Sequence, residues 1–513
     1  MKPSLFFLAF IRRTISGLFW LFAMAALSFV VLAATMYFWL LPNIADHRDT
    51  LADWMSRALG QRVTLEAVSG AWQQTRPRFS LSGVRLYDQQ NRPALYLEHL
   101  EATFGWRSLL VLQPRFSRLE LDGPALTVRR ARDGHYYVGG IPINPANPGS
   151  GFSDWLFKQD KVQVKRATLA WRDEVRDAPA LILRDLDFTL ENRFTRHWVQ
   201  VRATPPAALS MPITLKAELK GRSVSDLRTW SGVIRGSVAG SSLAQFAQWI
   251  DLPYPVARGW GAANVRLQID KGILSGVSAG LNVRDVSTHL AMGLSPLELH
   301  HLRGSVTWTR TGRKQAIDVQ ALTASLPGIK RVPAFTAGYA WDGDAREARA
   351  KNLNLAMLSS VLPALPMPLA LRDTVQNLQA RGRLDALQLR WQGASTSPSR
   401  FDLTTRFTGV HLAASGARPG VSNLSGSMRG NEKSGVIELH GKSMQLVLPQ
   451  IFRDPRLTLD TLQVRAGWKK RAQGVLITLT QMDFANADAA GSGQGTYESV
   501  KNHKGIINLA ARL

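Results

Sequence analysis

The sequence contains no cysteine, and it has no charged residue between Arg13 and Asp46. Without cysteine the chain cannot form disulfides, zinc–thiolate sites or iron–sulfur clusters, and it has no thiol nucleophile. The long uncharged stretch near the N-terminus has a different meaning, because such a run is unusual in a water-soluble core. The first absence excludes thiol chemistry, and the second favours a membrane-associated protein.

The familiar signatures of catalysis are also absent. No phosphate-binding G-x-x-x-x-G-K-[ST] loop, G-x-S-x-G elbow or H-E-x-x-H helix occurs. His300 and His301 would point to opposite faces of a strand, which argues against shared metal ligation. The acidic pairs Asp173/Glu174 and Asp185/Asp187 could suggest glycosidase carboxylates, but we expect them on solvated surface. We therefore expect neither an enzyme, nor a metal, nor a cofactor; a membrane-anchored hydrolase is the weakest alternative.

A single apolar segment near the N-terminus is long enough to cross a membrane. Residues 16–41 are almost purely apolar, and about 20 such residues in helical form span the hydrocarbon core. A cleaved signal peptide has a shorter apolar core. We predict an uncleaved anchor over residues 15–42. Aromatic side chains near the membrane interface are predicted at Trp20, Tyr37, Trp39 and Trp54.

The flanking charges predict how this anchor is oriented. Lys2, Arg12 and Arg13 precede the helix, whereas acidic residues are mixed with the basic ones after it. This modest bias places residues 1–14 in the cytoplasm and the rest outside it. A cysteine-free exported body fits the bacterial periplasm. We thus predict a single-pass protein of the bacterial inner membrane.

The chain is strongly basic, with a formal charge of +25 over 513 residues. Three explanations of this charge are open. The chain could bind anionic lipid headgroups, it could bind nucleic acid, or it could simply have a solvated, Arg-rich surface. The charge is spread evenly, without a long basic run, which argues against a nucleic-acid tail. We expect no nucleic-acid partner.

Beyond the anchor, the apolar pattern changes from helical to alternating. Residues 43–60 have helical periodicity and predict an amphipathic helix at the membrane surface. Most later segments alternate apolar and polar residues, as half-buried strands do. Short helical inserts are expected at 153–159, 242–250 and 353–362. The predicted fold is mostly β: an elongated, curved and repeating β-sheet groove with short helical inserts.

An internal repeat divides the β region. A helical segment followed by Leu-Pro occurs at 243–253 and again at 355–366, and Leu302-Arg-Gly-Ser matches Leu424-Ser-Gly-Ser. Such a period suggests modules added end to end. We predict an N-terminal groove segment at 61–240, a first repeat at 241–352 and a second at 353–513. The strand pattern at 505–513 has no closing element, which suggests a fragment of a longer protein.

Strands with one apolar face must bury that face against something. Two facing sheets would form ordinary sandwiches, whereas one curved sheet would leave an apolar trough that lipid tails could fill. Moving a two-chain lipid with roughly 30 CH₂ groups into water costs on the order of 25 kcal/mol, so a continuous apolar track would be needed. Any single apolar strand residue could equally fill a protein core instead of lining a trough. The predicted lining residues are Val199, Val201, Ile213, Leu215, Leu219, Val265, Leu267, Ile269, Leu457 and Leu459.

Several segments, in a fixed order, resemble one known family. They are Ala58-Leu-Gly-Gln-Arg-Val63, Val68-Ser-Gly-Ala-Trp72, Pro77-Arg-Phe-Ser-Leu81, Arg132-Asp-Gly-His-Tyr136, and Leu186-Asp-Phe-Thr-Leu-Glu-Asn192 with Pro205-Pro206. With the anchor and the helix at 243–250, they resemble the AsmA-like family, most closely its YhdP branch, with TamB as a more distant relative.

The resemblance implies a β-groove anchored in the inner membrane that conducts phospholipid toward the outer membrane and supports the outer-membrane barrier. Outer-membrane or periplasmic proteins are candidate partners. The alternative is a periplasmic scaffold or assembly factor for outer-membrane biogenesis that conducts no lipid. Family members of the YhdP branch are longer than this chain, so the outer-membrane contact would lie in a part that is missing here.

Overall fold

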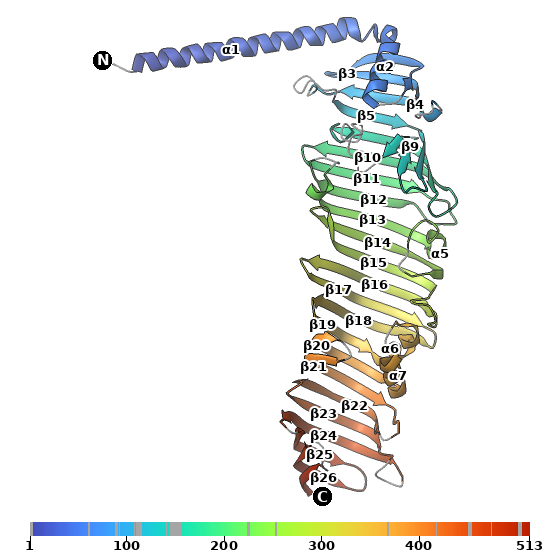
Figure 1. Cartoon of the computed structure of the whole chain (residues 1–513), viewed down its shortest axis with the longest axis vertical. Helices are drawn as coiled ribbons and strands as arrows, with labels where there is room; N and C mark the ends of the chain where they lie inside the picture. The colour runs from blue at the N-terminus through green and yellow to red at the C-terminus, as the bar shows by residue number, and fades with distance from the viewer. Residues whose placement is uncertain are drawn as a thin grey trace. The chain divides into compact units, whose positions relative to one another are not determined.

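The computed structural model divides the chain into two compact units. One comprises Met1–Ala207 and Pro212–Ile234, and the other Ala208–Met211 and Arg235–Leu513. The structure describes residues 4–513 except 60–61, 88–90, 92, 107, 109–114, 140, 144–155, 223–225, 252–253, 367–368, 395–396, 417, 450–453, 473 and 501–504. Each unit is built mainly from strands, with few helices (Figure 1).

The helices are concentrated at the N-terminus and at two points of the second unit. The long helix α1 is apolar over Ser16–Leu40, which is long enough to cross a membrane. This confirms the prediction of one N-terminal apolar helix of membrane-spanning length. The helical segments are α1 (Ser4–Thr35), η1 (Met36–Leu40), η2 (Ile44–His47), α2 (Arg48–Leu59), η3 (Leu227–Thr229), α5 (Leu243–Phe246), α6 (Leu355–Val361), η4 (Leu362–Ala364) and α7 (Leu369–Leu378).

In the first unit, strands β1 to β12 form a curved sheet, and β13 runs across the boundary between the units. Neighbours pair antiparallel, except that β9 runs parallel to both β5 and β6. The strands are β1 (Val63–Thr64), β2 (Ala67–Gln73), β3 (Arg76–Tyr87), β4 (Pro93–Phe104), β5 (Phe116–Asp122), β6 (Ala125–Arg130), β7 (Tyr136–Val138), β8 (Ile141–Ile143), β9 (Lys161–Asp173), β10 (Leu181–Arg193), β11 (Arg196–Thr204), β12 (Ile213–Lys220) and β13 (Ser231–Ser242).

In the second unit, strands β14 to β27 pair antiparallel in chain order. The mostly β fold with a long curved sheet is therefore confirmed. The strands are β14 (Val256–Asp270), β15 (Ile273–Thr288), β16 (Leu297–Thr311), β17 (Lys314–Leu326), β18 (Ile329–Asp342), β19 (Ala345–Asn354), β20 (Arg381–Ala394), β21 (Ser397–Leu412), β22 (Gly420–Asn431), β23 (Ser434–Val447), β24 (Arg456–Arg471), β25 (Gly474–Ala485), β26 (Ala490–Val500) and β27 (Ile506–Arg512).

Many of these strands bend at a residue with positive φ. Most such bends are also the points where the pairing register shifts, as between Val319 and Leu322 or Ser422 and Leu424. A left-handed residue with a bulge sharpens the local bend and twist of a strand. The residues concerned are Gly83, Arg166, Asp185, Asp285, Ala321, Asn352, Gly382, Gly409, Asn423 and Ser443.

Substitutions at one of these bends should change stability in opposite directions. Ala321 has φ 50°, and a side chain in this region costs about 1–2 kcal/mol. Ala321→Gly should therefore raise the free energy of unfolding slightly, and Ala321→Val should lower it by about 1–2 kcal/mol, because a β-branched residue tolerates positive φ least. Thermal unfolding of the full chain measures both, and equal effects of the two substitutions would contradict the role of the bend.

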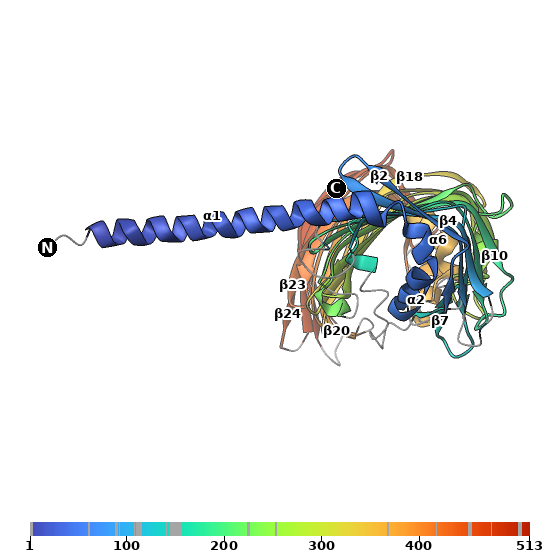
Figure 2. The same ribbon diagram turned by 90° about the horizontal axis from the view of Figure 1, so that it is seen from above.

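The inner face of each curved sheet is partly covered by a helix of the same unit. In the first unit α2 lies inside the bend (Figure 2), and its Ala52 packs with Val84 and Leu97. In the second unit α6 lies inside the bend, where Met357 packs with Val332 and Phe335. These clusters identify the inner face of the sheet in each unit.

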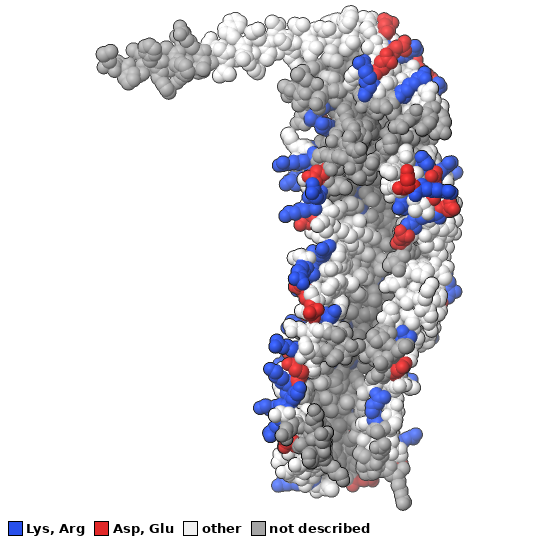
Figure 3. All heavy atoms as spheres, viewed as in Figure 1, with Lys and Arg blue, Asp and Glu red and all other residues white. Residues whose placement is uncertain are grey.

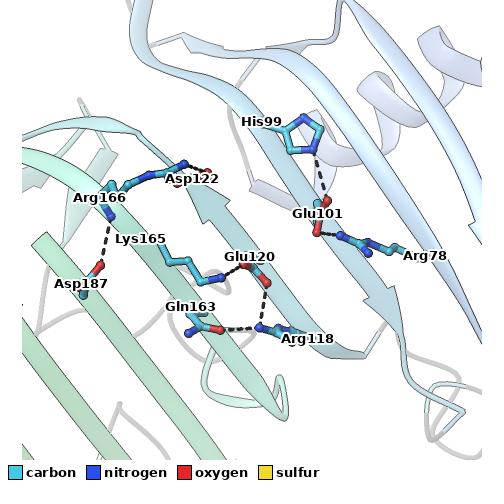
Figure 4. A network of polar contacts seen from close by, with 10 residues as sticks. All are labelled: Arg78, His99, Glu101, Arg118, Glu120, Asp122, Gln163, Lys165, Arg166 and Asp187. Atoms are coloured by element: carbon cyan, nitrogen blue, oxygen red, sulfur yellow. Dashed lines mark hydrogen bonds and ion pairs between the residues drawn. The ribbon is translucent and has the colours of Figure 1, made fainter. Parts of the chain in front are cut away.

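The outer face of the first unit carries a network of charged side chains (Figure 4). Glu120 on β5 accepts a hydrogen bond from Lys165 on β9 and pairs with Arg118 at 3.0 Å. Glu101 pairs with Arg78, and Asp122 pairs with Arg166. Burial raises the pKa of the Glu120 carboxyl, but the hydrogen bond from Lys165 and the nearby positive charges outweigh it, so this pKa lies below its ordinary value.

The Glu120 pairing should contribute pH-dependent stability to the first unit. Because the folded-state pKa is depressed, the contribution is fully present above the unfolded-state pKa of about 4.5 and is lost as the pH falls through the lower folded-state value. Glu120→Gln should cost about 0.5–1 kcal/mol at neutral pH and nothing at strongly acidic pH. The free energies of unfolding of the wild type and of Glu120→Gln, measured across this pH range, test the prediction. A loss of stability that persists in acid would contradict it.

The predicted helical inserts are only partly present in the described residues. The helix predicted at 242–250 is a single short turn, α5, since Ala247 to Trp249 continue as a turn rather than as helix. Of the insert predicted at 153–159, only Leu156 and Phe157 are described as helical. The third begins at the cap Asn354, whose side chain accepts a hydrogen bond from the Met357 amide. Helix α7 was not predicted. The division of the second unit into two repeats stays a prediction.

Candidate functional site

Two rows of cross-strand neighbours run over the inner face of the second unit. In each row every residue lies directly opposite the next, from β14 to β27. The first row is Leu267, Val277, Trp308, Ile317, Tyr339, Ala348, Leu389, Leu403, Gly430, Gly435, Trp468, Ile477, Tyr497 and Ile507. The second is Val265, Ala279, Val306, Val319, Ala337, Ala350, Leu387, Thr405, Met428, Ile437, Ala466, Leu479, Gly495 and Leu509. We call these two rows the apolar track.

The apolar track contains no charged residue over its 14 strands. Its only polar position, apart from the tyrosine hydroxyls, is Thr405. Ala337 contacts the cluster beneath α6, so the track lies on the inner face. Where Gly430 and Gly435 face each other, the Trp468 ring fills the space that a Cβ would need. The rows therefore form a continuous hydrocarbon surface.

This surface is only partly covered by protein. Apart from Ala350 and Gly430, every track residue is half-buried or exposed. Ile317, Tyr339, Ile477 and Tyr497 are 37–40% exposed, a large fraction for apolar side chains on an inner face. An exposed apolar patch of this extent usually marks a binding surface.

The opposite face of the same strands is polar. Arg266, Ser278, Thr307 and Asp318 are consecutive cross-strand neighbours there, and Arg349 donates a hydrogen bond to Asp318 at 2.9 Å. Looking into the open side of the second unit, charged side chains lie along its two edges, and the described atoms between them are uncharged (Figure 3). The second unit is thus apolar inside and polar outside.

The first unit has matching rows that are filled by protein. One row joins Phe79, Ala102, Leu119, Val162, Leu190, Val199 and Ala217. Leu119, Val162 and Leu190 are buried there and pack against Leu156 and Phe157. In this unit the inner face therefore serves largely as a protein core.

The predicted lining residues fall into three environments. On β11 and β12, Val199, Val201, Ile213, Leu215 and Leu219 share the inner face of the first unit; Val199 contacts the core, whereas Leu215 is 39% exposed.

In the second unit, Val265 and Leu267 belong to the apolar track, and Ile269 lies one step further along β14. Leu457 and Leu459 instead pack around the fully buried Met444. Sequence reasoning missed the track residues of β16 to β23, among them Trp308, Tyr339 and Leu389. Their alternation was the available signal, but bulges interrupt it.

The predicted interface aromatics Trp20, Tyr37, Trp39 and Trp54 are all exposed. Tyr37 lies 5.6 Å from the ring of Trp72 on β2. Phe29, in the middle of the apolar helix, lies 4.7 Å from Trp106. These ring contacts join the apolar helix to the β region of the first unit.

Other polar groups of the first unit are structural. The expectation that Asp173 lies on solvated surface is wrong, because it is 2% exposed and pairs with Arg130 and Arg176. His197 is buried between Asn192 and the Gly221 carbonyl, and burial lowers its pKa despite the hydrogen bond to Gly221. Among the described residues, no group of three or more His, Asp or Glu could hold a metal.

Comparison with known families gives one match, and it covers the whole chain. The family model described as "YhdP protein" matches residues 1–513. The chain belongs to the YhdP family. This confirms the resemblance to the YhdP branch of the AsmA-like proteins, and it supports a membrane-associated protein with one apolar anchor helix. No curated protein and no solved structure gives a significant match.

Proposed function

We propose that this YhdP-family chain is a membrane-anchored lipid-transfer protein. The apolar track holds the acyl chains of phospholipids and conducts them between the inner and the outer membrane, which supports the outer-membrane barrier. The chain is a single-pass inner-membrane protein, with its N-terminus in the cytoplasm and both β units in the periplasm. Its function is non-enzymatic.

The observation that carries this proposal is the open apolar track. Two cross-strand rows without a charge, only lightly covered, leave a large hydrocarbon surface that water alone would solvate poorly. Acyl chains match it in chemistry and in shape, since each CH₂ that leaves water gains about 0.8 kcal/mol. A lipid on the track therefore avoids most of the cost of crossing an aqueous space.

Site-specific photocrosslinking tests the proposal. Trp308 lies on the track and Thr309, the next residue of β16, faces the other side. A benzoylphenylalanine at position 308 should crosslink to phospholipid in living cells, and one at position 309 should not. Lipid is detected as radioactive phosphate or as a mass added to the chain.

Two results would speak against lipid conduction. Equal lipid crosslinking from both positions would indicate only general membrane contact. Crosslinks from position 308 to a protein, without lipid, would favour the periplasmic scaffold or assembly factor.

A further inference from the structure

A third row of the inner face lies beside the apolar track, toward the hairpin turns. Its residues are the next inward-facing ones after the first track row. Its members within the strands are Ile269, Leu274, Arg310, Gln315, Trp341, Arg346, Trp391, Phe401, Lys470, Val475 and Ser499, and the turn between β22 and β23 adds Glu432 and Lys433. We call this row the rim. Its charged members within the strands are Arg310, Arg346 and Lys470, all basic, and the two turn residues are one acidic, Glu432, and one basic, Lys433.

Arg346 has the most developed surroundings. It lies directly between Trp341 and Trp391 in the pairing of β18, β19 and β20. Tyr339 of the track lies 5.5 Å from the Trp341 ring and 6.1 Å from the Trp391 ring. The Arg346 guanidinium donates a hydrogen bond to the Gly393 carbonyl at 2.5 Å, which holds it at the turn end of the strands.

A cavity of about 480 Å³ opens at this edge. Arg346, Trp341, Trp391 and Phe401 line it, together with Lys314 and Arg400. Four carboxylates also line it, those of Asp342, Glu347, Asp402 and Glu432, and two of them have hydrogen-bond partners of their own. Glu347 accepts a hydrogen bond from Gln388 at 3.0 Å on the opposite face, and Glu432 accepts one from the Phe401 amide at 3.2 Å. The inner-face part of the lining is therefore aromatic, with Arg346 as its cation and Glu432 at the neighbouring turn, while the remaining charges, of both signs, come from the outer face.

This arrangement matches the two-part chemistry of a phospholipid. Two residues along a strand cover about 7 Å, so the rim is one short step from the track. A lipid whose chains lie on the track must place its polar end at an edge, because the track offers few hydrogen-bonding groups and no charge. Arginine binds phosphate oxygens in a bidentate manner, and tryptophan suits a boundary that is apolar on one side and wet on the other.

We propose that Arg310, Arg346 and Lys470 bind the phosphate of phospholipid headgroups while the acyl chains lie on the track. The inference rests on the proposed lipid-transfer function and adds to it the residues that hold the headgroup phosphate. The three cations lie on β16, β19 and β24, so at about 4.8 Å per strand they are roughly 14 Å and 24 Å apart along the row. A headgroup that moves along the row would therefore meet the three cations one after another.

Matched triple variants test this proposal. Arg310→Gln/Arg346→Gln/Lys470→Gln removes the rim charges. Arg303→Gln/Arg349→Gln/Lys469→Gln removes three charges from the outer face of the same strands. The full chain is purified and exchanged with vesicles that contain phosphatidylglycerol or the phosphate-free lipid diacylglycerol. Native mass spectrometry then counts the bound lipid.

The rim variant should bind roughly tenfold less phosphatidylglycerol and an unchanged amount of diacylglycerol, since charge-assisted hydrogen bonds to phosphate are lost. The outer-face variant should bind both lipids as the wild type does. If both variants lose phosphatidylglycerol binding equally, net charge alone explains the loss and the proposal is overturned. If the rim variant loses phosphatidylglycerol and diacylglycerol equally, the cations do not recognise phosphate and the proposal is overturned as well. A wild type that binds neither lipid would instead refute the proposed function itself.

Discussion

Two aspartates on the apolar track should stop lipid transfer while the chain stays folded. Ile477 and Tyr497 are direct cross-strand neighbours on β25 and β26, and both are about two-fifths exposed. A charge in a hydrocarbon environment costs about 2.5–3.5 kcal/mol, and each 1.4 kcal/mol is a factor of ten. Ile477→Asp/Tyr497→Asp should therefore slow transfer roughly 50-fold or more, as measured by movement of labelled phospholipid between membranes.

The outer face offers a closely matched control. Thr478 and Thr496 are the adjacent cross-strand pair, facing the other way on the same two strands. Thr478→Asp/Thr496→Asp introduces the same two charges at a similar separation across the pair, with similar repulsion. It should leave transfer unchanged. If the track variant is folded and transfers lipid at the wild-type rate, the track is not the path.

Loss of a core side chain in the first unit should have a large effect on stability. Leu190 is 1% exposed and contacts a cluster that includes Leu119 and Val162. Leu190→Ala should lower the free energy of unfolding by about 2–5 kcal/mol, because it removes buried surface and leaves a cavity. Denaturant unfolding of the full chain measures the loss, and limited proteolysis should locate it in the first unit.

Leu215 gives the matched comparison, since it lies on the same inner face but is 39% exposed. Leu215→Ala should cost less than about 1 kcal/mol, because little protein packs against it. Similar losses for the two variants would mean that Leu215 is covered in solution. The first unit's inner face would then be a closed core throughout.

The sequence predicted those features that depend on a simple period. The uninterrupted apolar run predicted the membrane-spanning part of α1, and the alternation of Val265, Leu267 and Ile269 predicted a one-faced strand. Both patterns work because side-chain direction follows directly from helix or strand geometry. The resemblance to the YhdP branch rested on the order of short segments, and the family match confirms it.

The remainder of the site could not be predicted, for two physical reasons. Bends such as those at Ala321 and Ser443 shift the pairing, so the alternation changes phase within a strand and hides the track residues beyond it. Whether an inner-face residue is covered by protein also depends on segments that are distant in the sequence. Val162 is buried because Leu156 and Phe157 lie over it, whereas Ile317 is left exposed. No local pattern distinguishes these two aliphatic residues.

The sameness of the apolar track has a consequence for the direction of lipid movement. A chain lying on Leu267 and Val277 meets nearly the same hydrocarbon environment as one lying on Ile477 and Tyr497. The hydrocarbon contribution to its free energy therefore changes little from strand to strand. If acyl chains occupy the track as proposed, this contribution favours neither direction of movement. If lipid moves along the track as proposed, net flow has to be imposed at its ends, by supply at one membrane and removal at the other.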